Sequence, residues 1–331
     1  MSEPRLEVQN FVESRFPGAA VERLAGDASY RIFFRIRPAS GPTFVLMDYG
    51  SPFQEETDDI WLGRLFRRAG LPVAELVQAV PEIGCLVLED LGDRSLESVL
   101  AEAESTKGAT PPAALVRAVE LAARVASKGT PVLASSERAE GPGLDSDRFR
   151  FEMDFFLEHF VSGLRGLADT PGELREQLYG LADRASATPT RVLCHRDFHS
   201  RNLMVLGDGG LAMVDIQDAR WGPDSYDLAS ILRDAYVDID DDWLEPLTNK
   251  YLGLLDRPPE PGGFRRRRDV VAAQRMIKAL GSFGYLTVVE RMDRYVEAIP
   301  RTLARLERLL PSLEATRPLH ESLLRSGLLR S

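Results

Sequence analysis

The stretch CHRDFHSRN, residues 194–202, has two chemical interpretations. His195, Asp197 and His199 alternate, and alternate side chains of an extended segment share a face, so the three could bind one metal ion. The same stretch also has the spacing H-R-D-x-x-x-x-N of a phosphoryl-transfer loop. In such a loop Asp197 accepts the proton of an acceptor hydroxyl and Asn202 binds Mg²⁺. The choice between the two decides both fold and function.

The surrounding sequence favours the phosphoryl-transfer loop. The two histidines outside this stretch, His159 and His320, do not lie among clustered ligands. After Asn202, the segments NLMVL and LAMVDI are predicted to form a hairpin through the turn GDGG. The hairpin leads to Asp215, at the distance expected of a second Mg²⁺ ligand. Carboxylate and amide oxygens are the ligands that Mg²⁺ prefers.

The composition is that of an ordinary globular protein: 331 residues, 44% hydrophobic and 28% charged. With a net charge of −10, we expect no attraction to nucleic acid or to an anionic membrane. No apolar run reaches the roughly 18 residues of a membrane span, and the N-terminus has no signal-peptide pattern. Cys85 and Cys194 lie in apolar runs, which predicts buried free thiols and a cytoplasmic protein.

The first ninety residues predict a small antiparallel sheet with one helix. A helical pattern runs from Phe53 to Gly70. The expected strands are YRIFFRI (30–36), TFVLM (43–47), PVAELVQAV (72–80) and GCLVLED (84–90). We assign residues 1–91 to an N-terminal nucleotide-binding lobe that ends in a hinge.

From residue 92 onward, helical periodicity dominates, and one short β segment, RVLCH with the hairpin, interrupts it. The expected helices are at about 95–103, 111–127, 147–165, 172–186, 224–237, 241–255, 265–290 and 297–313. The run Arg265–Arg268 is expected to be a solvated helix end. We assign residues 92–331 to a helical C-terminal lobe, which gives an α+β fold with its chemistry in a cleft between two lobes.

HRDFHSRNLMV, followed by MVDIQDARWGPDSYDLASILRD, resembles the aminoglycoside phosphotransferase and choline kinase superfamily. These are small-molecule kinases with a protein-kinase-like, two-lobed fold. Protein kinases match less well, because no DFG and no APE motif follows. The resemblance implies ATP and Mg²⁺ as cofactors, Asp197 as the base, and Asn202 and Asp215 as ligands of the metal and the nucleotide.

The same resemblance implies two further parts. Asp227, in SYDLAS, would hold the backbone of the catalytic loop. LVLEDLGDRSL (86–96) resembles the inter-lobe hinge, where main-chain groups from Glu89 to Leu91 would contact adenine.

Four longer stretches are similar to the bacterial N-acetylmuramate/N-acetylglucosamine anomeric kinases: GDASYRIFFRI, FVLMD, EMDFFLEHFV and AAQRMIKALGSFGYL. This implies an enzyme that phosphorylates the anomeric hydroxyl of a small sugar during cell-wall recycling. We also expect a monomer that is cytoplasmic. A kinase of another hydroxylated metabolite, such as choline or an aminoglycoside, is the alternative.

The chain departs from the kinase pattern in its third strand. A kinase has a lysine there, which contacts the phosphates and pairs with a helix glutamate. FVLMD has Met47 at that place, and no lysine precedes Lys107. The missing lysine keeps open a non-catalytic nucleotide-binding module.

Arginines are the cations of this lobe. Arg31, Arg35 and Arg37 alternate and so share a face of one strand. They form either an exposed arginine face on an edge strand or a contact to phosphates. The backbone from Gly26 to Ser29 could bind phosphates through its N–H groups. We therefore name Ser29 and Arg31 as candidate nucleotide ligands.

Two helical segments are candidates for the acceptor site. In FRFEMDFFLEHFV, Asp154 and Glu158 are at i and i+4 and share a face, whereas Glu152 lies elsewhere on the circumference. The second segment, AAQRMIKAL, has the cationic residues Arg275 and Lys278. Cationic groups there would suit an anionic acceptor, such as the lactyl carboxylate of N-acetylmuramate. A polycationic aminoglycoside would instead need a dense cluster of acids. The candidate acceptor-binding residues are Glu152, Asp154, Gln274, Arg275 and Lys278.

Overall fold

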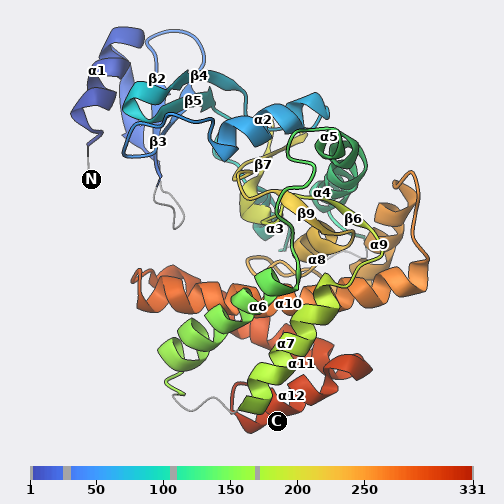
Figure 1. The fold of residues 1–331 in the computed structure, drawn as a ribbon. Helices are drawn as coiled ribbons and strands as arrows, with labels where there is room; N and C mark the ends of the chain where they lie inside the picture. The colour runs from blue at the N-terminus through green and yellow to red at the C-terminus, as the bar shows by residue number, and fades with distance from the viewer. Residues whose placement is uncertain (1–2, 25–30, 105–109, 168–171, 330–331) are drawn as a thin grey trace. The chain divides into compact units, whose positions relative to one another are not determined.

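The structure is a computed structural model that describes residues 3–24, 31–104, 110–167 and 172–329 (Figure 1). The chain divides into two compact units. The first consists of Met1–Arg94 with Met204–Gln217, and the second of Ser95–Leu203 with Asp218–Ser331. The segment that contains Asp215 therefore belongs to the first unit.

A five-stranded antiparallel sheet forms the body of the first unit, with the order β1-β2-β3-β5-β4. The strands are β1 (Ala20–Arg23), β2 (Ile32–Arg37), β3 (Phe44–Asp48), β4 (Leu76–Val80) and β5 (Cys85–Glu89). The four predicted strands are confirmed. The fifth, β1, was not predicted, because all four of its residues are exposed and give no apolar alternation. Its presence makes β2 an interior strand.

Two helices accompany this sheet, α1 (Leu6–Arg15) and α2 (Asp58–Arg68). The helix predicted before Gly70 is confirmed as α2. Helix α1 was not predicted, because it buries only Val8 and Val12, which pack with Phe34 of β2. Burying a side chain of this size contributes about 1.5–3 kcal/mol, so two such contacts suffice to dock a short helix.

The predicted hairpin is confirmed as β7 (Leu203–Val205) and β8 (Leu211–Met213). It is joined to the first unit by a hydrogen bond from the Met213 amide to the Pro72 carbonyl, 2.9 Å long. A parallel bridge between Val73 and Met213 adds to this contact. The end of β8, and with it Asp215, is thereby fixed in the first unit.

The second unit is mainly helical, as predicted. Its helices are α3 (Leu96–Glu104), α4 (Ala113–Arg124), α5 (Thr130–Ala134), α6 (Ser146–Phe155), α7 (Gly172–Ser186), α8 (Tyr226–Leu232), α9 (Leu244–Gly253), α10 (Pro261–Val288), α11 (Ala298–Ser312) and α12 (Arg317–Arg325). Helices α5 and α12 were not predicted, and α8 ends earlier than expected. Two π-helical segments, Val125–Gly129 and Phe156–Leu164, continue α4 and α6.

Helix α10 crosses the core of the second unit and packs closely against the π-helical segment after α6 (Figure 1). Phe156 and Phe160 from that segment are buried with Ile277 of α10. A Cβ atom at Gly284 would lie 2.4 Å from the carbonyl oxygen of His159, so this glycine permits the close approach. The two segments EMDFFLEHFV and AAQRMIKALGSFGYL are thus packing partners.

The second unit contains a small two-stranded sheet. Its strand β6 (Arg191–Cys194) was predicted, and it pairs with β9 (Arg220–Pro223), which was not. The sequence RWGP did not indicate a strand, because glycine and proline are rare in strand interiors. The pairing places Arg220 opposite Cys194, directly before the H-R-D loop.

Other predictions have mixed outcomes. Cys85 and Cys194 are buried free thiols, as expected, and burial raises the pKa of Cys85 to about 12. The solvated helix end is wrong for Arg268, which is 6% exposed and pairs with Glu245 across 3.1 Å. Within the part of the chain that the structure describes, no helix has the length and apolar character needed to cross a bilayer.

Candidate active site

The loop after β6 is held by a buried carboxylate. Asp227, in the first turn of α8, accepts hydrogen bonds from the amides of His195, at 2.7 Å, and Arg196, at 3.1 Å. Arg196 has a φ of 79°, in the left-handed region that a residue with a side chain adopts only at a cost of about 1–3 kcal/mol. The two bonds stabilise this conformation. The predicted role of Asp227 is confirmed.

The other end of the loop is fixed in the same way. Asp234 accepts a hydrogen bond of 2.6 Å from the amide of Ser200. Asn202 donates its Nδ2 to the carbonyl oxygen of Asp197 at 3.0 Å, and its amide N–H to the carbonyl of His199 at 3.0 Å. The first of these bonds turns the side-chain oxygen of Asn202 away from that carbonyl.

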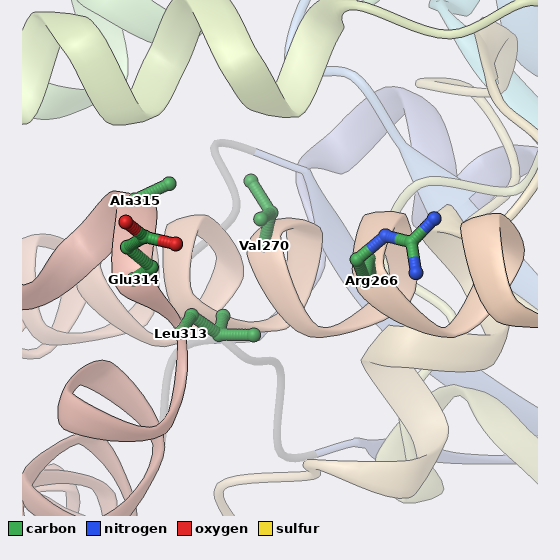
Figure 2. A pocket seen from close by; sticks show the side chains of 5 residues that line it. All are labelled: Arg266, Val270, Leu313, Glu314 and Ala315. Atoms are coloured by element: carbon green, nitrogen blue, oxygen red, sulfur yellow. The ribbon is translucent and has the colours of Figure 1, made fainter.

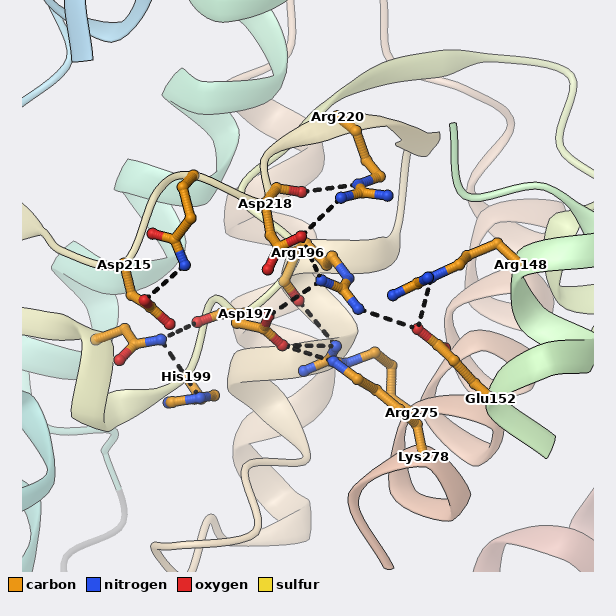
Figure 3. A network of polar contacts seen from close by, with 12 residues as sticks. Arg148, Glu152, Arg196, Asp197, His199, Asp215, Asp218, Arg220, Arg275 and Lys278 are labelled. Atoms are coloured by element: carbon orange, nitrogen blue, oxygen red, sulfur yellow. Dashed lines mark hydrogen bonds and ion pairs between the residues drawn. The ribbon is translucent and has the colours of Figure 1, made fainter. Parts of the chain in front are cut away.

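Three cations surround the carboxylate of Asp197 (Figure 3). Lys278 Nζ lies 2.7 Å and Arg275 Nη1 3.6 Å from its Oδ1, and Arg196 Nη1 lies 3.9 Å from its Oδ2. Burial alone would raise the pKa of Asp197, but Lys278, Arg196 and Arg275 outweigh this effect and hold the pKa well below its ordinary value. Asp197 is therefore a carboxylate at neutral pH.

Glu152 balances part of this positive charge. It is 4% exposed and accepts a hydrogen bond of 2.7 Å from Gln274 Nε2. Its Oε1 lies 3.5 Å from Arg196 Nη2, so it holds the arginine that flanks the base. Figure 3 shows Arg148 and Arg196 pointing towards Glu152 from two sides. The structure thus brings four predicted acceptor residues into the network of Asp197: Glu152, Gln274, Arg275 and Lys278.

Asp154 lies outside this network. Its two carboxylate oxygens accept hydrogen bonds from Arg175, at 2.8 Å, and from the Tyr179 hydroxyl, at 2.7 Å, both on α7. Glu158 has a side chain that is 74% exposed. The buried Glu152 therefore contacts the H-R-D loop, whereas Asp154 and Glu158, the acids that share a face at i and i+4, do not.

Two further residues of the network were missed. Asp218 Oδ1 lies 2.8 Å from Arg196 Nη1 and 2.7 Å from Arg220 Nη2. It is the second aspartate of VDIQD, which was the only signal that could have identified it. Arg220 could not be identified from the sequence, because its position beside the loop depends on the strand β9, which was not predicted.

The metal-cage interpretation of the loop is wrong. The ring of His195 packs edge-on against Phe198, with centroids 5.8 Å apart, and that of His199 against Tyr236, at 5.2 Å. Burial lowers the pKa of His199 to about 3, so its imidazole is neutral. Among the residues described, no group of three or more His, Cys, Asp and Glu side chains is arranged to hold a metal ion.

In the first unit, Asp215 follows β8 with a left-handed φ of 61°. Its Oδ1 accepts hydrogen bonds from Gln217 Nε2, at 2.8 Å, and Arg31 Nη2, at 3.2 Å. Arg31 is only 6% exposed and also pairs with Asp59 of α2. The exposed arginine face on an edge strand is therefore wrong, since Arg35 is buried too.

Arg35 fixes the segment after β5. It donates Nε and Nη2 to the two oxygens of Asp90, at 2.7 and 3.0 Å, and this carboxylate also accepts hydrogen bonds from Thr43 and Gly92. Both side chains of the pair are buried. Asp90 lies within the predicted hinge, and Arg35 reaches it from β2.

The predicted hinge residues flank Asp90 in sequence. Glu89 ends β5, and its amide donates to the Glu75 carbonyl at 2.8 Å. Leu91 is half-buried. Ser29, with the rest of Gly26–Ser29, lies outside the described residues.

A hollow of about 490 Å³ lies elsewhere on the second unit (Figure 2). Its lining comes from α10 and from the connection between α11 and α12, and consists of Arg266, Val270, Leu313, Glu314 and Ala315. None of these residues belongs to the network around Asp197. We assign the chemistry to the H-R-D loop instead.

An antiparallel-sheet unit, a mainly helical unit and a carboxylate-held H-R-D loop are the parts of a protein-kinase-like phosphotransferase. Residues 20–268 match the model of the phosphotransferase enzyme family, and the chain belongs to this family.

Relatives extend the comparison over most of the chain. The N-acetylmuramate/N-acetylglucosamine kinase of Neisseria meningitidis serogroup B is 28% identical, with 96% of this chain and 94% of that protein covered. The enzyme of the same name from Pseudomonas putida is 27% identical, with 89% and 84% covered. A spectinomycin phosphotransferase, solved with ADP and spectinomycin, has the same fold at a TM-score of 0.61 and 9% identity, with 99% and 100% covered.

Proposed function

We propose that the protein is an ATP- and Mg²⁺-dependent kinase that phosphorylates the anomeric hydroxyl of N-acetylmuramate or N-acetylglucosamine. The observation that carries the proposal is the carboxylate of Asp197, held in a fixed loop and kept ionised by Lys278, Arg275 and Arg196. The names of the two relatives supply the sugars.

The environment of Asp197 favours an acidic acceptor. A carboxylate with a depressed pKa is a weak base, and general-base catalysis is most effective when the proton is easy to remove. The anomeric hydroxyl is more acidic than the other hydroxyls of a sugar. Positioning this hydroxyl against Asp197 would therefore select the site of transfer without a covalent enzyme intermediate.

The charge around Asp197 also bears on the second candidate, a kinase of choline or of an aminoglycoside. Lys278 and Arg275 together exceed the charge of the carboxylate that they flank. A cationic acceptor would be repelled there, since like charges in a partly buried site interact strongly. A neutral sugar is accepted, and the lactyl carboxylate of N-acetylmuramate is favoured. Glu152, which pairs with Arg196, balances only part of this positive charge.

The donor chemistry fits a magnesium ion. Asp215 offers a carboxylate and Asn202 an amide oxygen, the hard donors that Mg²⁺ prefers. The hydrogen bond from Asn202 Nδ2 to Asp197 orients that amide. When bound, the ion would neutralise charge on the transferred phosphoryl group. We assign Asn202 and Asp215 as metal ligands on this chemistry and on their places in the motif.

The remaining nucleotide contacts are assigned by their places in the sequence. Main-chain groups from Glu89 to Leu91 would contact adenine, beside the Arg35–Asp90 pair that fixes this segment. Ser29 would contact phosphates through its backbone. We further propose a monomer that acts in the cytoplasm on recovered cell-wall sugars and binds no nucleic acid, in keeping with the net charge of −10.

An acceptor panel tests the proposal. The protein is incubated with ATP and Mg²⁺, and ADP release is followed with N-acetylglucosamine, N-acetylmuramate, choline or an aminoglycoside as acceptor. We expect ADP release that depends on either N-acetylated sugar. Release only with choline or an aminoglycoside would contradict the sugar assignment. Nucleotide binding with no turnover on any acceptor would instead identify a non-catalytic binding module.

A further inference from the structure

The first unit has no lysine with which to bind nucleotide phosphates. The sequences of residues 1–94 and 204–217 contain none, and Met47 occupies the place in β3 where a kinase has its phosphate-binding lysine. Met47 is buried on the face of the sheet that also packs Ile60 of α2. Some other cation must serve there if the protein binds a nucleoside triphosphate.

Arg31, directly before β2, reaches this place. Its Nη1 lies 3.9 Å from the Sδ atom of Met47, so the guanidinium lies beside the side chain that replaces the lysine. The same nitrogen donates to Asp59 Oδ1 of α2 at 2.6 Å. Asp59 is held in turn by a hydrogen bond of 2.6 Å from the Tyr49 hydroxyl to its Oδ2. A carboxylate on this helix thus orients the cation, as a helix glutamate orients the lysine of a kinase.

The other side of the guanidinium meets the proposed metal ligand. Arg31 Nη2 lies 3.2 Å from Asp215 Oδ1. Two carboxylates, Asp59 and Asp215, therefore share the Arg31 guanidinium, and the oxygens of Asp215 suit a magnesium ion that arrives with its nucleotide. A guanidinium presents its donors in a planar fork that matches phosphate oxygens, so arginine can do this work as well as lysine.

We propose that Arg31, directly before the neighbouring strand β2, supplies the phosphate-binding cation that β3 lacks, and that Asp59 positions it. The inference rests on the proposed nucleotide-dependent function. Arg31 would bind the phosphates in place of the missing lysine, and Asp59 would orient Arg31 in place of the helix glutamate. The ligand is the phosphate chain of a nucleoside diphosphate or triphosphate.

Calorimetric binding of Mg²⁺-ADP and of adenosine, without any acceptor, tests the inference. In Arg31→Gln we expect the affinity for ADP to fall about 10–100-fold, as for the loss of a charge-assisted hydrogen bond, and that for adenosine to be unchanged. Adding Met47→Lys to this variant should recover at least about tenfold, because it returns a cation to β3. Arg37→Gln is the matched control, since Arg37 lies on β2 but pairs at the surface with Glu22.

Each result decides one question. Equal loss of ADP and adenosine binding in Arg31→Gln, or no loss of either, would show a purely structural arginine and overturn the inference. If that variant does not fold, Asp59→Asn replaces it. We expect its affinity for ADP to fall about tenfold and its affinity for adenosine to be unchanged. Equal changes in the two affinities would contradict the inference. A wild-type protein that binds neither ligand would instead overturn the proposed function.

Discussion

In each unit, a cationic side chain pairs with an aspartate of the predicted phosphoryl-transfer site, but the two clusters differ in their ratio of carboxylates to cations. In the first unit, Asp59 and Asp215 both pair with the guanidinium of Arg31. In the second, Asp197 faces three cations, of which Lys278 is the nearest at 2.7 Å, and one of the three, Arg196, also pairs with Glu152 and Asp218. Carboxylates thus outnumber the guanidinium that they share in the first cluster, whereas cations outnumber the carboxylate around Asp197. This difference supports our proposal that the metal-bound nucleotide binds to the first cluster and the acceptor to the second.

The largest effect is expected when the base itself is removed. Asp197→Asn keeps the shape of the side chain but cannot accept the proton of the acceptor. Turnover should fall about 10²–10⁴-fold, the usual contribution of a positioned general base, while affinity for Mg²⁺-ADP is unchanged. Steady-state kinetics with N-acetylglucosamine and a nucleotide titration measure the two quantities.

The matched control for this variant is Asp154→Asn. Asp154 is also predicted from the sequence, but it pairs with Arg175 and Tyr179 at the surface of the second unit. Its turnover should stay within about twofold of the wild type, as for a surface change. A catalytic loss as large as that of Asp197→Asn would show that the acceptor site lies elsewhere on α6.

The next effect separates a buried structural arginine from an exposed one on the same strand, β2. Arg35 and Asp90 form a pair in which both side chains are buried, so Arg35→Met leaves an uncompensated buried carboxylate. The free energy of unfolding should fall by about 3–5 kcal/mol. Urea unfolding measures this, with Arg37→Met as the control, because its exposed pair with Glu22 contributes about 1 kcal/mol or less. Equal losses in the two variants would contradict the structural role of Arg35.

The smallest effect concerns the cation nearest the base. Lys278→Met should lower turnover at pH 7.5 by about 10–100-fold, because the cation that positions the Asp197 carboxylate and faces the proposed acceptor is lost. It should also raise the pKa of Asp197, because burial is then less opposed. As the base must be deprotonated, the acid limb of the pH–rate profile should move to higher pH.

The same change affects folding in a defined direction. A carboxylate with a depressed pKa stabilises the fold above its unfolded pKa, about 3.9, and this stability is lost as the pH falls through the folded pKa. Lys278→Met should therefore lose stability at neutral pH, and its stability should fall off from a higher pH than that of the wild type. Lys250→Met, at a surface pair with Glu120, is the control. A pH–rate profile of Lys278→Met identical to that of the wild type would contradict the assigned coupling.

The parts of the site that lie close in sequence were predictable. The spacing from Asp197 to Asn202, the hairpin before Asp215 and the bracing by Asp227 are local features with fixed geometry. The four strands of the main sheet followed from alternation and from turn residues. In these cases short-range stereochemistry determines the structure.

The remaining parts depend on contacts between distant segments. Periodicity placed Lys278 on a helix face but could not show that this face meets Asp197, which lies 81 residues earlier. Periodicity also could not decide whether Asp154 or Glu152 lies beside the H-R-D loop. Arg31 and Arg35 were correctly placed on one face, but their burial depends on β1 and α2, and β1 gave no apolar signal.

The central claim is transfer to an anomeric hydroxyl by Asp197, and the phosphorylated product tests it most directly. N-acetylglucosamine or N-acetylmuramate is incubated with ATP, Mg²⁺ and the protein, and the product is analysed by ³¹P NMR, acid treatment and a reducing-sugar assay. We predict an acid-labile, non-reducing sugar 1-phosphate, and no phosphorylation of the methyl glycoside. An acid-stable phosphate on a sugar that is still reducing would contradict the account.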